Sequence, residues 1–513
     1  MEILPYNYFF LLLPLLVLPL YFLKTRKFDD DQNKPNLPPG PPKLPIVGNL
    51  HQLGKPPHQA LSKLSKIYGS VMLLQFGSVP TLVISSAEAA KQVLKTLDLE
   101  FCTKPPLTGT KRLSYNFLDI GFGPYGEYWK EVRKICVLEL LSVKRVQSFK
   151  ADRAEEIDVL IDSLTVSSNT CRSVDVFEAL TSFTHKTICR VAFGSATGQS
   201  RNLFNGRLTK ILFEAMSVLS GFYASDFFPK VGWIVDRVTG IHGRTEKVFH
   251  DLDELFQQMI QEHLNPARPK PEHEDLIDVL RKLENDQTSS TVRLANDNIK
   301  AILMNIFLAG VDSSAVAANW AMAELAKNPE AMKKVQEEIR SHVGSKGKVE
   351  ESDLDNLFYL KMVVKETFRL HPGNALLVRE CMKHSRIDGF DVYPKTTVLI
   401  NVWATGRDPK YWQNPEIFLP ERFKDSSIDF SGSQNFEYLP FGGGRRGCPG
   451  MSMATVLIEL VLANLLYAFD WKLPKGLNKG DLNMEESQGL TIHKKYPLDL
   501  VPIKYAYGSD ELN

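Results

Sequence analysis

One cysteine in this chain stands where its surroundings favour metal binding. Cys448 closes the run Phe441-Gly-Gly-Gly-Arg-Arg-Gly-Cys, and after Pro449 and Gly450 an apolar stretch, Met451 to Tyr467, predicts a helix. A sulfur at a helix N-terminus lies near unpaired backbone N–H groups and the positive end of the helix dipole, which favours thiolate over thiol. The glycines let backbone approach a planar group closely, and the arginines can pair with its carboxylates. These features describe a haem pocket with Cys448 as the axial iron ligand.

Two other interpretations of this loop compete with a haem pocket. A lone cysteine is most often a small buried hydrophobic residue. A glycine-rich loop before a helix can also hold a phosphate, but this one lacks the Gly-Lys-Ser/Thr ending of a P-loop. The loop alone therefore leaves the inert cysteine open.

A second unusual stretch lies inside the longest helical pattern, Asp297 to Ala326, which would span roughly 45 Å. It contains Ala309-Gly310-Val-Asp312-Ser313. Glycine costs about 1 kcal/mol relative to alanine in a helix, and a buried acid costs more unless it has a partner. Such violations often mark functional positions. Asp312 on a solvated face is the alternative, but its apolar neighbours favour burial.

The remaining patterns are mainly helical, with a smaller β-containing part. Residues 101–125 have poor periodicity and predict a mobile loop. Glu366 and Arg369, three apart on a predicted helix, can pair, although such pairs are usually on the surface. The predicted elements are a hairpin of 71–76 and 81–84, helices 86–97, 126–141 and 360–370, and a strand at 396–400.

Composition excludes several classes of protein. The net charge of +1 over 513 residues gives no support to nucleic-acid binding. Six scattered cysteines, without a C-x-x-C pair, argue against structural zinc and a secreted disulfide scaffold.

The N-terminus predicts a membrane anchor. Ile3 to Leu23 carries no charge and is followed by Lys24-Thr-Arg26-Lys27, the reverse of the charge order in a cleaved signal peptide. Leu37-Pro-Pro-Gly-Pro-Pro42 then predicts either a stiff spacer or an indifferent linker. We expect four parts: an anchor at 1–27, a proline-rich linker at 28–45, a catalytic domain at 46–505 and a polar tail at 506–513.

Several separated stretches together resemble one family, the haem-thiolate monooxygenases (cytochromes P-450) of the plant microsomal type. The resemblance covers essentially all 513 residues. It implies a mainly α fold with a smaller β-rich part, preceded by one N-terminal transmembrane helix. The matching motifs are Phe441-x-x-Gly444-x-Arg446-x-Cys448-x-Gly450, Glu366-x-x-Arg369, Pro420-Glu-Arg422-Phe423, Ala309-Gly310-x-Asp312, Trp129-x-x-x-Arg133 and Asn414-Pro-Glu416.

The resemblance implies a role for each site residue. Cys448 would be the iron ligand, and Phe441 would shield the thiolate side; Gly450 would also contact the haem. Gly310 would open the long helix for dioxygen, while Asp312 and Ser313 would deliver protons. The propionates would be bound by Trp129, Arg133, Arg379 and Arg446, and a buried structural triad would comprise Glu366, Arg369 and Arg422.

The chain departs from the family pattern twice. Ser313 stands where threonine is usual, and family members altered there include some that rearrange substrates. Gly373 replaces a usual proline before Arg379, which loosens a segment that normally faces the substrate.

The resemblance implies a monooxygenase that hydroxylates a lipophilic small molecule, such as a plant terpenoid. It would use O₂, haem b and electrons that reach it from NADPH only through a flavoprotein reductase, with a cytochrome b-type protein as a second donor. Lys130, Lys134, Lys144, Arg145 and Arg445 would form the donor-docking face.

Other functions remain open from the sequence. They are an O₂-independent rearrangement or dehydration, oxidation of an alkaloid or phenylpropanoid, and a non-catalytic haem-binding protein. In every case we expect a single-pass protein of the endoplasmic reticulum membrane, with its main body in the cytosol.

Overall fold

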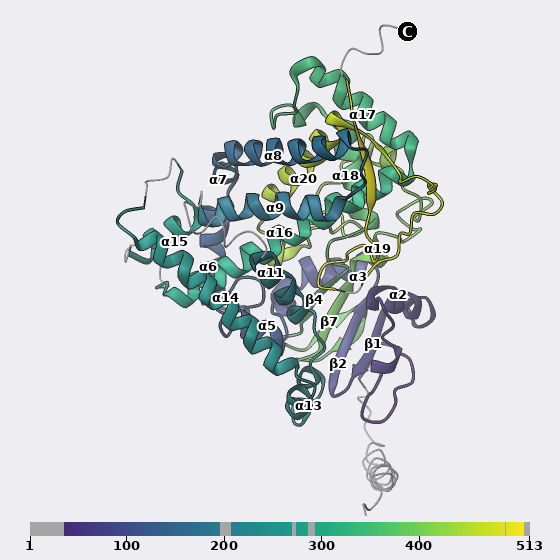
Figure 1. The fold of residues 1–513 in the computed structure, drawn as a ribbon. Coiled ribbons are helices and arrows are strands. Elements are labelled where there is room, and N and C mark those ends of the chain that lie inside the picture. The colour runs from purple at the N-terminus through teal and green to yellow at the C-terminus, as the bar shows by residue number, and fades with distance from the viewer. Residues whose placement is uncertain (1–34, 195–206, 269–272, 286–292, 488, 507–513) are drawn as a thin grey trace, which may run out of the picture.

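The computed structural model describes residues 35–194, 207–268, 273–285, 293–487 and 489–506. The predicted anchor at 1–27 and nearly all of the predicted tail at 506–513 lie outside these ranges. Within them the protein is mainly helical with a smaller β part, as predicted (Figure 1).

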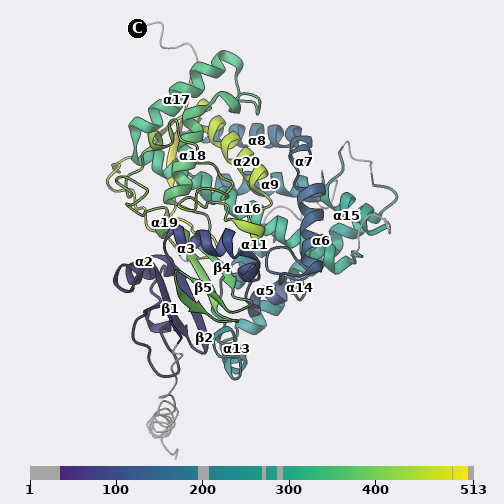
Figure 2. The same ribbon diagram turned by 180° about the vertical axis from the view of Figure 1, so that it is seen from behind.

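Helices form most of the body, and the largest described sheet lies to one side of them in both views (Figure 1 and Figure 2). The described helices are α2 (Pro57–Tyr68), α3 (Ala87–Lys91), α4 (Asp98–Phe101), α5 (Thr108–Leu113), α6 (Glu127–Ile135), α7 (Val143–Ser148), α8 (Lys150–Asn169), α9 (Val176–Phe193), α11 (Arg207–Leu219), α12 (Ala224–Phe227), α13 (Gly232–Val238), α14 (Ile241–Leu264), α15 (Leu276–Asn285), α16 (Asn296–Lys327), α17 (Pro329–Val343), α18 (Phe358–Leu370), α19 (Val402–Thr405) and α20 (Met451–Ala468).

The largest described sheet has the order β1-β2-β7-β4. The predicted hairpin is confirmed: β1 and β2 pair antiparallel, from Val71 with Ile84 to Phe76 with Val79. The predicted strand at 396–400 is β7, which runs parallel to β2. The strands are β1 (Val71–Phe76), β2 (Val79–Ile84), β3 (Val174–Asp175), β4 (Leu376–Glu380), β5 (Ser385–Ile387), β6 (Phe390–Val392), β7 (Thr397–Asn401), β8 (Phe469–Lys472) and β9 (Asp499–Lys504).

The predicted long helix is confirmed as α16, which runs through the main hydrophobic core. Its N-terminal turn is fixed by Asn298, whose Oδ1 accepts the Ala295 N–H at 2.8 Å. It ends before Pro329, which begins α17 at the position where proline costs a helix least. Helices α9, α18 and α20 pack against it, so α16 can position side chains toward the Cys448 loop.

Two membrane-length helices occur in the described part of the chain, α16 and α20. Both are mostly buried inside the protein, which is the environment of core helices.

Two segments differ from the sequence prediction. Residues 101–125 are not wholly a loop, because α5 forms there and is followed by left-handed backbone at Tyr115, Asn116 and Phe117. The proline-rich stretch is not a free spacer: Leu73 donates its N–H to the Pro39 carbonyl at 2.9 Å. This stretch packs along β1 and is part of the folded body.

Candidate functional site

The Cys448 loop is shaped by backbone that only glycine tolerates. Gly444 has φ +67°, and a Cβ there would lie 2.5 Å from the Leu94 carbonyl oxygen. The loop closes on itself where Cys448 donates its N–H to the Phe441 carbonyl at 2.9 Å. Gly450 precedes α20, and a Cβ there would lie 3.9 Å from Cys448 Sγ. The loop therefore presents the sulfur at the N-terminus of a buried helix, as predicted.

Cys448 is exposed, yet burial raises the pKa of its thiol, while the Gly450 N–H and Arg133 oppose that rise. A side chain can be both accessible and desolvated only in a concave wall of the protein. The helix terminus favours the thiolate, as predicted, but desolvation outweighs its contribution. A positive partner such as a metal ion is needed, since a coordinating thiol loses its proton.

Phe441 lies in an aromatic cluster beside this sulfur. Its ring centroid is 5.2 Å from Phe368 and 5.5 Å from Phe430. Because the Phe441 carbonyl also accepts the Cys448 N–H, the cluster fixes the loop and covers it with apolar surface.

Three arginines gather at the loop: Arg133 and Arg379 come from other elements, and Arg446 belongs to the loop itself. Arg133 on α6 donates to the Gly447 carbonyl at 2.5 Å, and Arg379 on β4 donates to the Gly443 carbonyl at 3.4 Å. Arg446 donates to the carbonyls of Cys102 at 2.6 Å and Gly123 at 2.5 Å. Its Nη1 is buried without a hydrogen-bond partner among the described residues. A donor left over in this way fits an anionic ligand.

The cations repel one another in a desolvated space. Burial lowers the pKa of Arg379 and of Arg446 to about 10 each, and in Arg446 the neighbouring Arg379 lowers it further. Burial, followed by Arg379 and Arg446, lowers the pKa of Lys104 to about 7. The nearby carboxyl of Asp119 is itself hard to ionise, because burial raises its pKa. Such a cluster can hold two carboxylates of a planar ligand.

Trp129 contacts this cluster through its ring. Its indole N–H donates to the Ile120 carbonyl at 2.9 Å, so that donor is already used. The guanidinium carbons of Arg446 and Arg133 lie 4.3 and 5.4 Å from the ring centroid. Trp129 therefore orients two arginines by cation–π contact.

On α16 the predicted residues face different ways. Ala309 is exposed in the mostly buried middle of the helix, and the Ser313 hydroxyl donates to the Ala309 carbonyl at 2.7 Å. Gly310 faces α9, because a Cβ there would lie 2.9 Å from Ile188 Cδ1. Close packing of α9 on α16 thus explains this glycine. Asp312 is buried, and its Oδ2 lies 3.2 Å from His493 Nε2.

The structure joins Glu366, Arg369 and Arg422 in one cluster. Arg369 donates to both carboxylate oxygens of Glu366 at 2.8 Å, and Arg422 donates to Oε1 at 2.9 Å. Glu366 and Arg369 are 0% and 1% exposed, so the pair is not a surface ion pair. Arg369 also donates to the carbonyls of Gly406 and Pro415 at 2.7 and 2.6 Å. The cluster therefore ties α18 to the chain that leads into the Cys448 loop.

Comparison with known proteins identifies the family. The Cytochrome P450 family model matches residues 38–499. The chain belongs to the cytochrome P450 family. Relatives in Arabidopsis thaliana include Cytochrome P450 71B34, 50% identical over 92% of this chain and 94% of that protein, and Cytochrome P450 71B36, 48% identical over 96% and 99%. A zebra fish cytochrome P450 solved with abiraterone is 25% identical, with a TM-score of 0.72 over 88% of this chain and all of that one.

Membership in the cytochrome P450 family confirms the predicted enzyme class and cofactor. The protein is an oxidoreductase, a monooxygenase that uses haem b and receives electrons from NADPH through a reductase. The residues around Cys448 fit that cofactor, because an unpaired guanidinium donor and mutually repelling cations lie beside an accessible sulfur.

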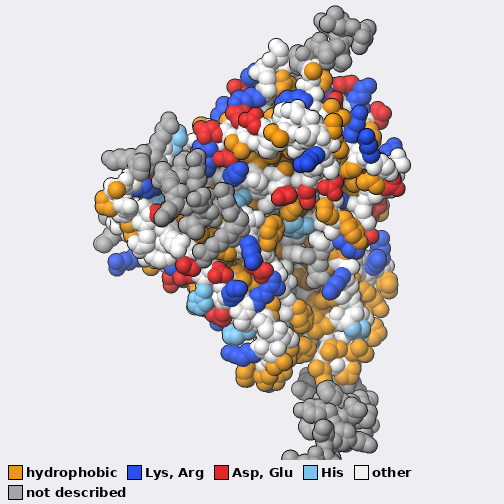
Figure 3. All heavy atoms as spheres, in the orientation of Figure 1, with side chains coloured by type: hydrophobic (Ala, Val, Ile, Leu, Met, Phe, Trp, Pro, Cys, Tyr) orange, Lys and Arg blue, Asp and Glu red, His pale blue; other side chains and the backbone are white. Residues whose placement is uncertain are grey.

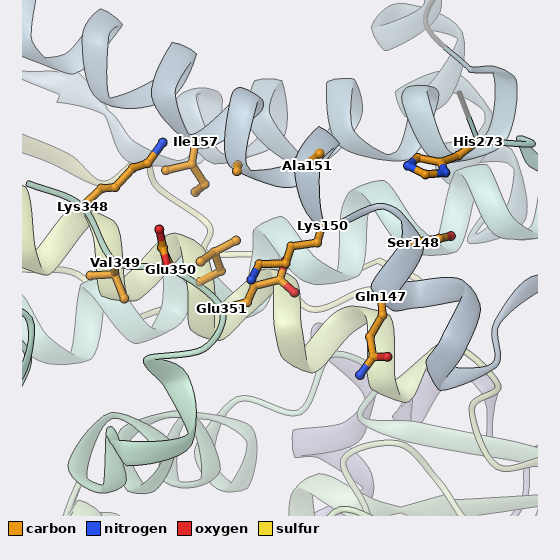
Figure 4. A pocket seen from close by; sticks show the side chains of 12 residues that line it. Gln147, Ser148, Lys150, Ala151, Ile157, His273, Lys348, Val349, Glu350 and Glu351 are labelled. Carbon is orange, nitrogen blue, oxygen red and sulfur yellow. The ribbon is translucent and has the colours of Figure 1, made fainter. Parts of the chain in front are cut away.

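The cavity in Figure 4, of about 540 Å³, is a separate feature. It lies between the start of α8 and residues 348–351, and its lining includes Gln147, Lys150, His273 and Leu460. None of the predicted site residues lines it, so it is not the reaction chamber.

Sequence reasoning gave no role to Lys104 and His493, two residues that the structure brings to the site. Lys104 and Asp119 fall in the aperiodic stretch, where no spacing rule applies. Asn305, whose Oδ1 accepts the N–H groups of Ile120 and Gly121, links that stretch to α16. His493 belongs to no motif, so the sequence gave no signal for it.

Proposed function

We propose that this cytochrome P450 hydroxylates a lipophilic plant specialised metabolite, such as a terpenoid, while anchored to the endoplasmic reticulum membrane. The observation that carries the proposal is Cys448, an accessible sulfur in a desolvated wall at the N-terminus of α20. Bound there, haem b supplies oxygen activation, and the thiolate supplies electron density to the iron.

Each residue around the loop takes a part in holding the cofactor. Arg133, Arg379 and Arg446 bind the propionates, and Lys104 adds a fourth donor. Trp129 stacks against the arginines and keeps their planes in place. Phe441 excludes water from the sulfur, while Gly450 leaves the space beside it free of a side chain.

Helix α16 supplies protons and leaves room for a small molecule. Ala309 presents only a methyl group where α16 is accessible, which leaves room for a small molecule. Asp312 and the Ser313 hydroxyl deliver protons to the reaction site. Gly310 serves this arrangement indirectly, by letting α9 pack closely and fix the helix.

Apolar residues support a lipophilic substrate. Leu118, Phe122 and Leu377 are partly exposed, and Leu377 Cδ2 lies 3.7 Å from the Cβ position of Gly442 in the Cys448 loop. An apolar chamber with few polar anchors suits an apolar small molecule. A spectral screen with terpenoids, alkaloids and phenylpropanoids, watching the Soret band, tests this substrate class.

Ser313 motivates a second candidate function, an O₂-independent rearrangement or dehydration. Its hydroxyl is committed to the Ala309 carbonyl, in a helix where threonine is usual for monooxygenation. Turnover of the best compound from the screen, with and without NADPH and O₂, separates the two functions. The proposed monooxygenase requires NADPH and O₂, and it places one oxygen atom from labelled O₂ in the product. Turnover in the absence of both NADPH and O₂ would instead establish the second function.

A surface of apolar side chains supports membrane attachment. In Figure 3 apolar side chains gather at the end of the molecule that carries α13. Trp233, Val238 and Ile46 are 50%, 82% and 62% exposed. Hydrogen bonds join the segments: Gly77 donates to the Val47 carbonyl, and Ser78 donates to the Phe227 carbonyl. We propose that this surface lies in the bilayer interface beside the anchor.

Exposed cations on α6 support the predicted docking of an acidic reductase. Arg133 of α6 contacts the Cys448 loop, while Lys130 and Lys134 lie exposed on the same helix. Lys134→Glu should slow electron transfer from the reductase about threefold at low salt and less at high salt, because screening weakens charge steering. Stopped-flow reduction under carbon monoxide measures this rate.

Lys333→Glu is the matched control for that experiment. Lys134 and Lys333 are 62% and 72% exposed, and each lies near a glutamate of its own helix, at 3.9 and 3.7 Å. The control on α17 should reduce at the wild-type rate. Equal rates for both variants at every salt concentration would contradict docking at α6.

A further inference from the structure

The Asp312 carboxylate is paired with a histidine that no sequence motif indicated. Its Oδ2 lies 3.2 Å from Nε2 of His493, a residue far away in the sequence. The Asp312 side chain is 2% exposed, whereas that of His493 is 26% exposed. His493 therefore lies between a buried acid and the outside of the protein.

The chain around His493 is held firmly against α16. The Ile492 carbonyl accepts the indole N–H of Trp320, on α16, at 2.7 Å, and Ile492 donates its N–H to the Gly373 carbonyl at 3.0 Å. The His493 ring packs edge-on against Phe177, with centroids 5.2 Å apart. The segment that carries His493 is thus anchored to α16, and its ring lies against Phe177.

A small cavity of about 160 Å³ lies against His493. Asn319, which is 3% exposed, lines it, and Asn319 Oδ1 has no hydrogen-bond partner among the described residues. A cavity of this size with polar groups such as Asn319 and His493 in its lining has room for more than one water molecule. Asp312, Val316 and Asn319 recur four and three residues apart, so the acid and the cavity share one face of α16. The cavity is lined by Asp175, Phe177, Val316, Asn319, His493, Lys494, Lys495, Tyr496 and Pro497.

The two ring nitrogens of His493 have different surroundings. Nε2 faces Asp312, and no described residue hydrogen-bonds Nδ1. A neutral imidazole donates from one nitrogen and accepts at the other, so it can receive a proton on one side and release another on the opposite side.

We propose that His493 is a positioning residue that carries protons from this cavity to Asp312. After Asp312 has released its proton, an O–H bond of cavity water breaks as an N–H bond forms at Nδ1, and the Nε2–H bond breaks as an O–H bond forms on the Asp312 carboxylate. The hydroxide left in the cavity takes a proton from bulk water. Ring rotation and exchange with cavity water restore the starting tautomer. This inference rests on the proposed function, in which Asp312 supplies protons for oxygen activation.

Two substitutions separate proton transfer from a merely structural role. His493→Gln keeps an N–H donor for Asp312 but cannot accept and release protons, whereas His493→Phe loses both abilities. With the reductase and the compound that shifts the Soret band most, both variants should form about tenfold less product per NADPH and release more peroxide. If His493→Gln matches wild type, the role is structural at most and the proposal is overturned.

Asp312→Asn tests the proposed function separately. If it matches wild type, Asp312 is not the proton donor and the proposed role of that residue fails. If it loses product while His493→Gln does not, the proposed function stands and only the relay fails.

A spectroscopic measurement tests the contact independently of turnover. In reduced, carbon monoxide-bound protein with ¹⁵N-labelled histidine, the signals absent from His493→Gln belong to His493. They should show the proton on Nε2 and should shift in Asp312→Asn. A proton on Nδ1, or signals unmoved in Asp312→Asn, would overturn the proposal.

Discussion

Replacing Glu366 with glutamine should destabilise the protein by about 3–5 kcal/mol, because it leaves two buried cations without their carboxylate. Arg369 has no exposed side-chain surface and Arg422 is 8% exposed, so water cannot replace the lost charge at Arg369 and can do so little at Arg422. The Leu419 N–H also loses its charged acceptor, Glu366 Oε1 at 2.8 Å. Unfolding followed by far-UV circular dichroism and haem absorbance measures the effect.

Glu214→Gln is the matched control. Glu214 pairs with Arg244 at 2.6 Å, but their side chains are 42% and 45% exposed. Removing an exposed pair costs less than about 1 kcal/mol. Similar stabilities for the two variants would contradict a structural role for the buried cluster.

Cys448→Ser should abolish turnover while leaving the fold intact. The residue makes its backbone hydrogen bond to Phe441 through its N–H, which serine retains, and the two side chains are similar in size. The serine hydroxyl is a far weaker electron donor to iron than a thiolate, so the electronic basis of oxygen activation is lost. Product formation with reductase and NADPH, together with circular dichroism, checks both halves of this expectation.

Cys136→Ser is the comparison for this substitution. Cys136 is buried at the C-terminal end of α6, and burial raises the pKa of its thiol to about 12, so it is an inert core thiol. Its replacement should lower stability slightly and leave the haem spectrum unchanged. A spectrum altered by Cys136→Ser rather than by Cys448→Ser would contradict the ligand assignment.

Much of the fold could be predicted because its signals are local. Helix α16 is visible in the sequence as a long apolar run, and Pro329 and Pro372 mark where α16 and α18 end. The turn at Gly77 likewise sets the register of β1 and β2. In each case a short run of sequence determines the element.

The site was predictable where one motif holds several residues, as around Cys448. It was less predictable where function depends on packing between distant segments. Nothing near Gly310 indicates that Ile188 on α9 requires it to be glycine. The pairing of Asp312 with His493 spans 181 residues and depends on how the C-terminal segment packs on α16.

Charge and burial also act together in ways that a sequence does not show. The helix terminus and Arg133 favour a thiolate at Cys448, but desolvation opposes them and prevails. The indole N–H of Trp129 donates to the Ile120 carbonyl, and the face of its ring contacts Arg446 and Arg133. Both outcomes follow from three-dimensional surroundings rather than from residue types.

The central claim is that Cys448 is the thiolate ligand of a haem iron. The most direct measurement is the absorption spectrum of the purified, reduced protein with carbon monoxide, for wild type and for Cys448→Ser. The account predicts a strongly red-shifted Soret band for wild type, as a thiolate ligand produces, and none for Cys448→Ser. An unshifted band in the wild type, or a red-shifted band that survives in Cys448→Ser, would contradict it.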